Sequence, residues 1–205
     1  MALLRRTDVS PASWISSSEI AWRQLATFGP SVFAVYARLL FLRDPAYPGE
    51  TSSDAGRTAT RDGREQWPLL AERLAAHTRA ADDCYFCLWD GWPTLRGGSV
   101  GTLLSGAQVK ISDDAGHPMR AYLLFHGPLS EIGEWDVPWL DTGEPFGFEP
   151  AFIWPADHAW CVTKDVDPHW AGIGGDRPLI DELLQDPRLD VVKADPTADQ
   201  PHYYR

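Results

Sequence analysis

The sequence predicts an α+β fold: a mainly antiparallel sheet of about five to six strands, with N-terminal helices and one C-terminal helix packed on one face. The first observation is order, because helical patterns fill residues 14–80 and strand patterns with short connections fill residues 84–196. The second is that no unit repeats at a fixed period, which argues against a solenoid. The third is size, since 205 residues, 44% of them hydrophobic and 23% charged, suit a single globular domain.

Three helices are expected in the N-terminal part. Residues 16–29 begin with serines that can cap a helix, and they end at Gly29. Residues 30–42 begin with a proline, and their apolar side chains recur at helical spacing. Residues 65–80 carry a leucine stripe, with Pro68 expected in the first turn. These helices would cover part of the sheet.

The rest of the chain is predicted to form the sheet and one more helix. Residues 44–63 are rich in turn formers and lack periodicity, so we expect a mobile loop there. The strand candidates are short, rich in aromatic or β-branched residues and bounded by turns. They are residues 84–92 with their turn, 107–111, 120–127, 148–154, 159–167, 169–175 and 189–194. The last helix is expected after Asp176, its cap, with Leu179, Ile180, Leu183 and Leu184 buried.

The acidic composition limits the partners. A formal net charge of −11 argues against nucleic acid, whose phosphates need clustered lysine and arginine, and favours a basic protein or a cation. No stretch reaches the roughly 18–20 apolar residues of a membrane helix, so no membrane partner is expected. Three cysteines, an odd number, indicate reduced thiols and a cytoplasmic protein.

Asp165 and Asp167 form the first candidate site. Two residues apart in a strand, they project from one face, where the preceding residue Thr163 brings no positive charge. Two close carboxylates repel each other unless a cation or a shared proton intervenes, so a divalent cation joined by His169 would fit. No other cofactor is expected. The alternative, which the frequency of Asp in turns favours, is that both accept hydrogen bonds at a solvated strand end.

A turn between two tryptophans is the second candidate. Asp90 and Gly91 form a strong turn signal, and Trp89 and Trp92 flank it. An aromatic wall beside an acid suits a planar or cationic ligand. A hairpin whose tryptophans lie in the core is the favoured alternative, because large aromatic side chains are more often core than site.

Cysteine spacing raises the question of zinc. Cys84, Cys87, His158 and Cys161 together offer a plausible ligand set. Residues three apart in a strand point to opposite faces, however, and Tyr85 and Phe86 favour a strand here. We therefore expect buried structural cysteines instead of a metal site or a redox pair.

An acid beside a histidine is the last candidate. Asp157 could orient His158 for general base catalysis. Adjacent residues rarely face each other, and no nucleophile stands in a recognisable motif nearby. The sequence favours a turn that Asp157 caps.

Residues 152–190, "FIWPADHAWCVTKDVDPHWAGIGGDRPLIDELLQDPRLD", resemble a group of actinobacterial proteins of unknown activity. "CYFCLWDGW", "RAYLLFHGPL" and "GPSVFAVYARLL" resemble earlier segments of that group, the last of them its N-terminal helix. The similarity covers most of the chain except residues 44–63 and 93–106. It implies a whole protein of bacterial origin, and no substrate or site residue.

Three hypotheses for function follow. The leading one is a non-enzymatic binding protein for a basic partner, as an immunity protein binds a toxin, because the chain is acidic and lacks a catalytic motif. The second is a small-molecule or metal-dependent enzyme or sensor that uses Asp165, Asp167 and His169. The third is a subunit of a larger assembly, held by exposed tryptophans such as Trp14, Trp135 or Trp139.

Overall fold

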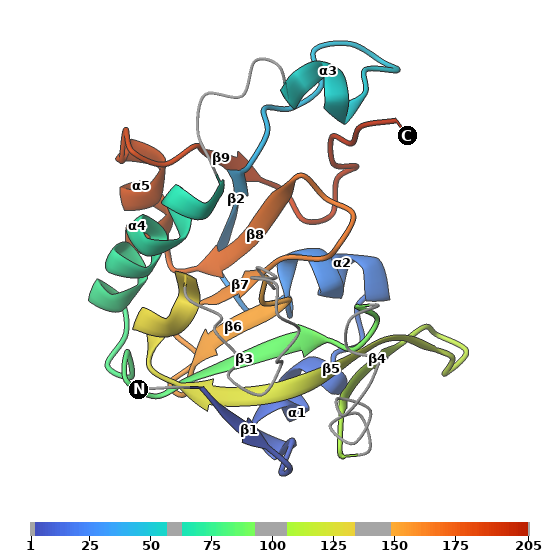
Figure 1. Cartoon of the computed structure of the whole chain (residues 1–205), viewed down its shortest axis with the longest axis vertical. Helices are drawn as coiled ribbons and strands as arrows, with labels where there is room; N and C mark the ends of the chain where they lie inside the picture. The colour runs from blue at the N-terminus through green and yellow to red at the C-terminus, as the bar shows by residue number, and fades with distance from the viewer. Residues whose placement is uncertain (1–2, 57–62, 93–105, 134–148, 205) are drawn as a thin grey trace, which may run out of the picture.

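A computed structural model describes residues 3–56, 63–92, 106–133 and 149–204. Its centre is one nine-stranded sheet in the order β1-β5-β3-β6-β7-β8-β2-β9, with β4 also beside β5 (Figure 1). Every strand pairing is antiparallel. The strands are β1 Leu4–Arg6, β2 Val35–Leu40, β3 Cys84–Trp89, β4 Val109–Ser112, β5 Pro118–Gly127, β6 Phe152–Pro155, β7 Cys161–Thr163, β8 Trp170–Gly175 and β9 Val191–Ala194. The antiparallel α+β prediction is confirmed, but five to six strands was too few.

The predicted helix over residues 30–42 is wrong. Residues 35–40 form β2, which lies between β8 and β9. Its burial pattern explains the error, because residues 35–39 are all buried and no polar alternation marks a strand. Without that alternation, the apolar positions happened to match helical spacing. Strand β2 also breaks the expected division into a helical part over 14–80 and a sheet part over 84–196.

Helices lie on both faces of the sheet, not on one as expected. Alternate residues of a strand point to opposite faces, and β8 shows the consequence. Ala171 and Ile173 belong to the core cluster that contains the buried face of α5, whereas Gly172 lies against the backbone of α2. The helices are α1 Ser13–Ser16, α2 Trp22–Phe28, α3 Ser52–Gly56, α4 Gly63–Ala76 and α5 Arg177–Gln185, with 3₁₀ turns at Ser10–Ala12 and Leu129–Gly133.

Two helix ends follow the sequence signals, but α2 begins at Trp22 after Ala21 and not at the serines that were expected to cap it. Gly29, at φ 75°, ends α2, and the Asp176 side chain accepts a hydrogen bond from the Leu179 backbone at the start of α5. Helix α4 begins before Glu65, so Pro68 lies in its second turn instead of its first. Leu184 of α5 was expected to be buried but is 37% exposed.

The segment from residue 44 onward is only partly a loop. It contains α3, and the side chain of Glu50 is buried against Arg43 and the backbone of Ala46. The C-terminal tail returns to it, since the Tyr204 backbone donates to the Glu50 carbonyl. Residues 57–62 of this predicted loop and the glycine-rich residues 93–105 lie outside the described parts of the chain. Within those parts, no helix is long and apolar enough to cross a membrane.

Candidate functional site

Asp165 is neutralised by an arginine that sequence reasoning did not connect with it. Strand β7 ends at Thr163, so Asp165 and Asp167 follow the strand instead of sharing a strand face. Arg120, on β5, donates to both carboxylate oxygens of Asp165, at 3.0 and 2.9 Å. Asp167 is 59% exposed and lies 3.9 Å from the same guanidinium. The positive charge that the two carboxylates require therefore comes from the chain itself.

Two indole rings hold this arginine. The guanidinium carbon of Arg120 lies 5.2 Å from the ring centroid of Trp22 and 5.6 Å from that of Trp89. Both distances are within the range of a cation–π contact. The side chains of Arg120 and Asp165 are 15% and 9% exposed. An aromatic wall, an acid and a cation do meet here, but the rings are those of Trp22 and Trp89 and the acid is Asp165, not Asp90.

His169 does not join this pair. Its Nε2 lies 3.1 Å from Asp44 Oδ1, and Asp44 also binds both terminal nitrogens of Arg38. Burial lowers the pKa of His169, and the bond to Asp44 opposes that shift. A His169–Asp44–Arg38 cluster thus links β2 to the segment before β8, away from Asp165's partner Arg120.

The Trp89–Trp92 turn lies near Asp165. The rings of Trp89 and Trp92 meet edge to face, and both line a hollow of about 40 Å³ with Asp165. Asp90 forms the expected turn and accepts a hydrogen bond from Gln108 Nε2 at 3.0 Å. The Trp89 ring lies directly over Gly91, where an added Cβ would be 2.1 Å from it.

The four candidate zinc ligands are not gathered at one point. Cys84 belongs to the core cluster on one face of the sheet, whereas Cys87 and Cys161 belong to the cluster on the other, as strand alternation predicts. All three thiols are free and buried, and burial raises the pKa of Cys84 to about 12. His158 is exposed and stacks on Trp14 at 4.3 Å.

Asp157 caps the turn, as the sequence favours. Its carboxylate accepts hydrogen bonds from the Thr78 hydroxyl and from the backbones of Arg79 and Ala159. No hydrogen bond joins Asp157 to the ring of His158 among the described residues. The pair is therefore not arranged for acid–base catalysis.

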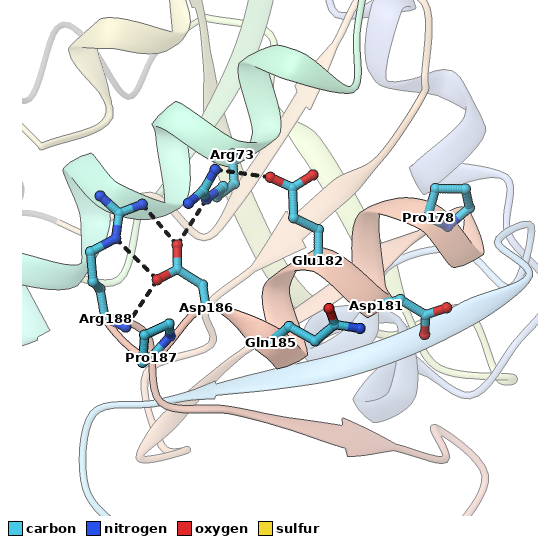
Figure 2. Close-up of a pocket in the computed structure, with 8 residues that line it drawn as sticks. All are labelled: Arg73, Pro178, Asp181, Glu182, Gln185, Asp186, Pro187 and Arg188. Atoms are coloured by element: carbon cyan, nitrogen blue, oxygen red, sulfur yellow. Dashed lines mark hydrogen bonds and ion pairs between the residues drawn. The ribbon is translucent and has the colours of Figure 1, made fainter.

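A larger hollow, of about 540 Å³, opens where α4 meets α5 (Figure 2). Arg73 comes from α4, and the other lining residues come from α5 and the turn after it. The lining consists of Arg73, Pro178, Asp181, Glu182, Gln185, Asp186, Pro187 and Arg188. It holds three carboxylates against two guanidinium groups, so a cation is better matched to it than an anion.

Asp186 organises the charges of this hollow. Its carboxylate accepts hydrogen bonds from Arg188 Nε and Nη2, from the Arg188 backbone and from Arg73 Nε, at 2.8–3.0 Å. The Asp186 side chain is only 2% exposed, whereas Arg73 and Arg188 are 30% and 42% exposed. Arg73 also binds Glu182, whose other oxygen lies 2.8 Å from His77 Nε2. These bonds, those of Arg188 first, hold the pKa of Asp186 well below its usual value.

Two polar side chains of the hollow remain available. Asp181 and Gln185, one turn apart on α5, have no hydrogen bond or ion pair to other residues in the described ranges. In Figure 2 both project from the same side of α5. Their spacing of four on a helix was readable from the sequence. The arginines were not, because Arg73 and Asp186 are 113 positions apart.

Comparisons of the chain with models of protein families, with curated proteins and with solved structures found no match.

Proposed function

We propose that the protein is a non-enzymatic binding protein whose partner is a basic protein, and that the α4–α5 hollow receives a cationic side chain of that partner. The observation that carries this proposal is the excess of carboxylates in an open hollow, on a chain of net charge −11. An immunity protein that neutralises a basic toxin has this character. Three free, buried thiols support a reducing compartment, the cytoplasm.

The hollow suits recognition because its charges are fixed before a partner arrives. Buried Asp186 holds Arg73 and Arg188 in place, so these arginines have little freedom to turn toward Asp181. A partner's ammonium or guanidinium group can then pair with Asp181 and donate a hydrogen bond to the Gln185 side-chain carbonyl. Complementary charge at such a rim raises the association rate and sets orientation.

The enzyme or sensor alternative has less support from the same structure. Arg120 takes both oxygens of Asp165, and His169 is bonded to Asp44. A divalent cation at Asp165 would have to displace a guanidinium held between two rings. The assembly alternative rests on exposed tryptophans, but Trp14 is partly buried against Trp154, and Trp135 and Trp139 lie outside the described residues.

Capture of partners with two matched variants tests the proposal. Asp181→Lys reverses a charge in the hollow, and Asp114→Lys makes the same change in an exposed turn between β4 and β5. Each immobilised protein is exposed to extract of its source cells at low salt, and the captured proteins are identified and eluted with salt. We expect a basic protein that binds the native chain and Asp114→Lys, is lost with Asp181→Lys, and elutes as salt rises.

Two outcomes contradict the proposal. If the native chain captures no protein at low salt, the proposal of a basic protein partner is contradicted. Equal loss with both variants would show that only net charge matters and that the hollow is not the contact.

A further inference from the structure

A lysine lines the small hollow beside the Trp89–Trp92 turn. The hollow measures about 40 Å³, and a water molecule needs about 10–15 Å³ of such space, so about three non-hydrogen atoms fit. Its walls are mostly apolar or aromatic. The lining residues are Trp89, Trp92, Glu149, Ala151, Lys164, Asp165 and Val166.

The main chain fixes this lysine in place. Lys164 follows β7 directly, and its backbone donates to the Ala151 carbonyl at 2.9 Å. Its side chain is only 9% exposed. The Nζ atom donates to the carbonyl oxygens of Asp165 at 2.8 Å and Pro168 at 2.9 Å, and lies 3.7 Å from Glu149 Oε2. Two of the three donor positions of the ammonium group are thus used, and the third has a carboxylate nearby.

This arrangement also suits the neutral amine. Burial lowers the pKa of Lys164, although the charges of Glu149 and Asp165 oppose the shift. A neutral amine has two N–H bonds, which the two carbonyls can still accept, and one lone pair. The lone pair then occupies the position that neither carbonyl takes. A lysine that burial desolvates is a recognised form of activated nucleophile.

We propose that Lys164 forms an imine with a small aldehyde bound in the hollow that Trp89 and Trp92 line, with Glu149 as the proton carrier. Glu149, at the rim with its side chain 42% exposed, accepts a proton from the ammonium group. The amine attacks the carbonyl carbon, and the C–N bond forms as the carbonyl π bond breaks. Protonation of the oxygen, with loss of the second amine proton, gives a neutral carbinolamine. Glu149 then protonates the hydroxyl, which leaves as water as the nitrogen lone pair forms the C=N bond. No oxidant or reductant is needed.

The size of the hollow selects the aldehyde. Acetaldehyde has three non-hydrogen atoms, which matches the space available. The acidic neighbour Glu149 disfavours an α-oxo acid, whose carboxylate it would repel. The residues involved differ from those of the α4–α5 hollow, so this proposal and the binding proposal stand or fall separately.

Reductive trapping tests the proposal on the intact protein. The chain has three lysines, and Lys110 on β4 and Lys193 on β9 are exposed, so they serve as internal references. The protein is incubated with acetaldehyde and cyanoborohydride, and ethylated lysines are located by peptide mass spectrometry. A positioned general acid contributes on the order of a hundredfold to the rate. Because the Lys164 side chain is only 9% exposed, slower access of the aldehyde offsets part of this gain. We therefore expect Lys164 to be labelled about tenfold faster than either reference. Because burial lowers the pKa of Lys164, its labelling should also persist to a lower pH than is usual for a lysine.

A matched variant separates chemistry from simple exposure. Glu149→Gln keeps the shape of the partly exposed side chain and should slow labelling at Lys164 alone, with Lys110 and Lys193 unchanged. Lys164→Arg should leave only the two reference sites labelled. Labelling of Lys164 no faster than the references, or an unchanged rate in Glu149→Gln, overturns the proposal.

Discussion

Asp165 and Asp186 are both buried carboxylates bound by arginine. The arginine of Asp165 is covered by aromatic rings, whereas the arginines of Asp186 line an open hollow. Asp165 has one arginine, which is 15% exposed and covered by Trp22 and Trp89. Asp186 has two, Arg73 and Arg188, which are 30% and 42% exposed and face a hollow of about 540 Å³. An arginine–aspartate ion pair thus occupies the space between two rings in the first region. In the second region, the same kind of ion pair fixes the charges around an open hollow. Residue type alone does not distinguish these roles.

The largest effect on stability is expected from the closed pair. Arg120→Met leaves the Asp165 charge buried without its partner, and we expect the free energy of unfolding to fall by about 3–5 kcal/mol. Chemical denaturation measures it. The double variant Arg120→Met with Asp165→Leu should recover most of the loss, because it removes the buried charge as well. A loss below about 1 kcal/mol in the single variant would mean that the pair behaves like an exposed one.

The open pair should contribute less. Asp186→Asn keeps the shape of the side chain, and we expect a loss of about 1–2 kcal/mol, since water reaches both arginines. The bonds from Arg188 and Arg73 hold the pKa of Asp186 below its usual 3.8, so its contribution is present above that pH and is lost as pH falls below it. The stability gap between native protein and variant should therefore narrow in acid. A gap that stays constant down to pH 3 would contradict this origin.

The ring over Gly91 gives a smaller effect on the closed region. Gly91→Ala places a Cβ 2.1 Å from the Trp89 ring, so this ring, which contacts Arg120, must shift. We expect a loss of about 1 kcal/mol, the low end for overpacking because a side chain can yield, together with a change in tryptophan fluorescence. Gly56→Ala is the control, since its added Cβ meets nothing within 4 Å. Equal fluorescence changes in both would show that the Trp89 contact is not responsible.

The smallest effect on stability should come from the available carboxylate of the hollow. Asp181→Asn breaks no bond to a described residue, so unfolding free energy should change by less than about 0.5 kcal/mol. Affinity for the captured partner should fall by roughly twofold to fivefold, as for loss of one exposed ion pair of about 0.4–1 kcal/mol. Isothermal titration calorimetry and denaturation of the same samples compare the two quantities. A large loss of stability with unchanged affinity would assign Asp181 a structural role.

Local signals predicted local structure well. The cap at Asp176 and the buried face of Leu179, Ile180 and Leu183 located α5, and Gly29 located the end of α2. Strand β2 was missed because both of its faces are covered, which removes the alternation that identifies a half-buried strand. Strand β1 spans only three residues, too few for any periodicity.

The sites depended on contacts that no local pattern records. Arg120 stands in an apolar strand, 45 positions before the carboxylate that it binds. Trp89, Trp92 and Asp165 line one small hollow, although the turn and the aspartate are far apart in the sequence. Which cation they hold could not be predicted, because strand order decides whether β5 brings Arg120 there.

The most direct test of the central claim is an NMR titration of the ¹⁵N-labelled protein with a short arginine-containing peptide at low salt. We predict that chemical-shift changes gather on α5, including the Gln185 side-chain amide, that they vanish in Asp181→Lys and that they persist in Asp114→Lys. Changes spread evenly over the acidic surface, or concentrated on the indole signals of Trp89 and Trp92, would contradict the assignment of the open hollow as the binding site.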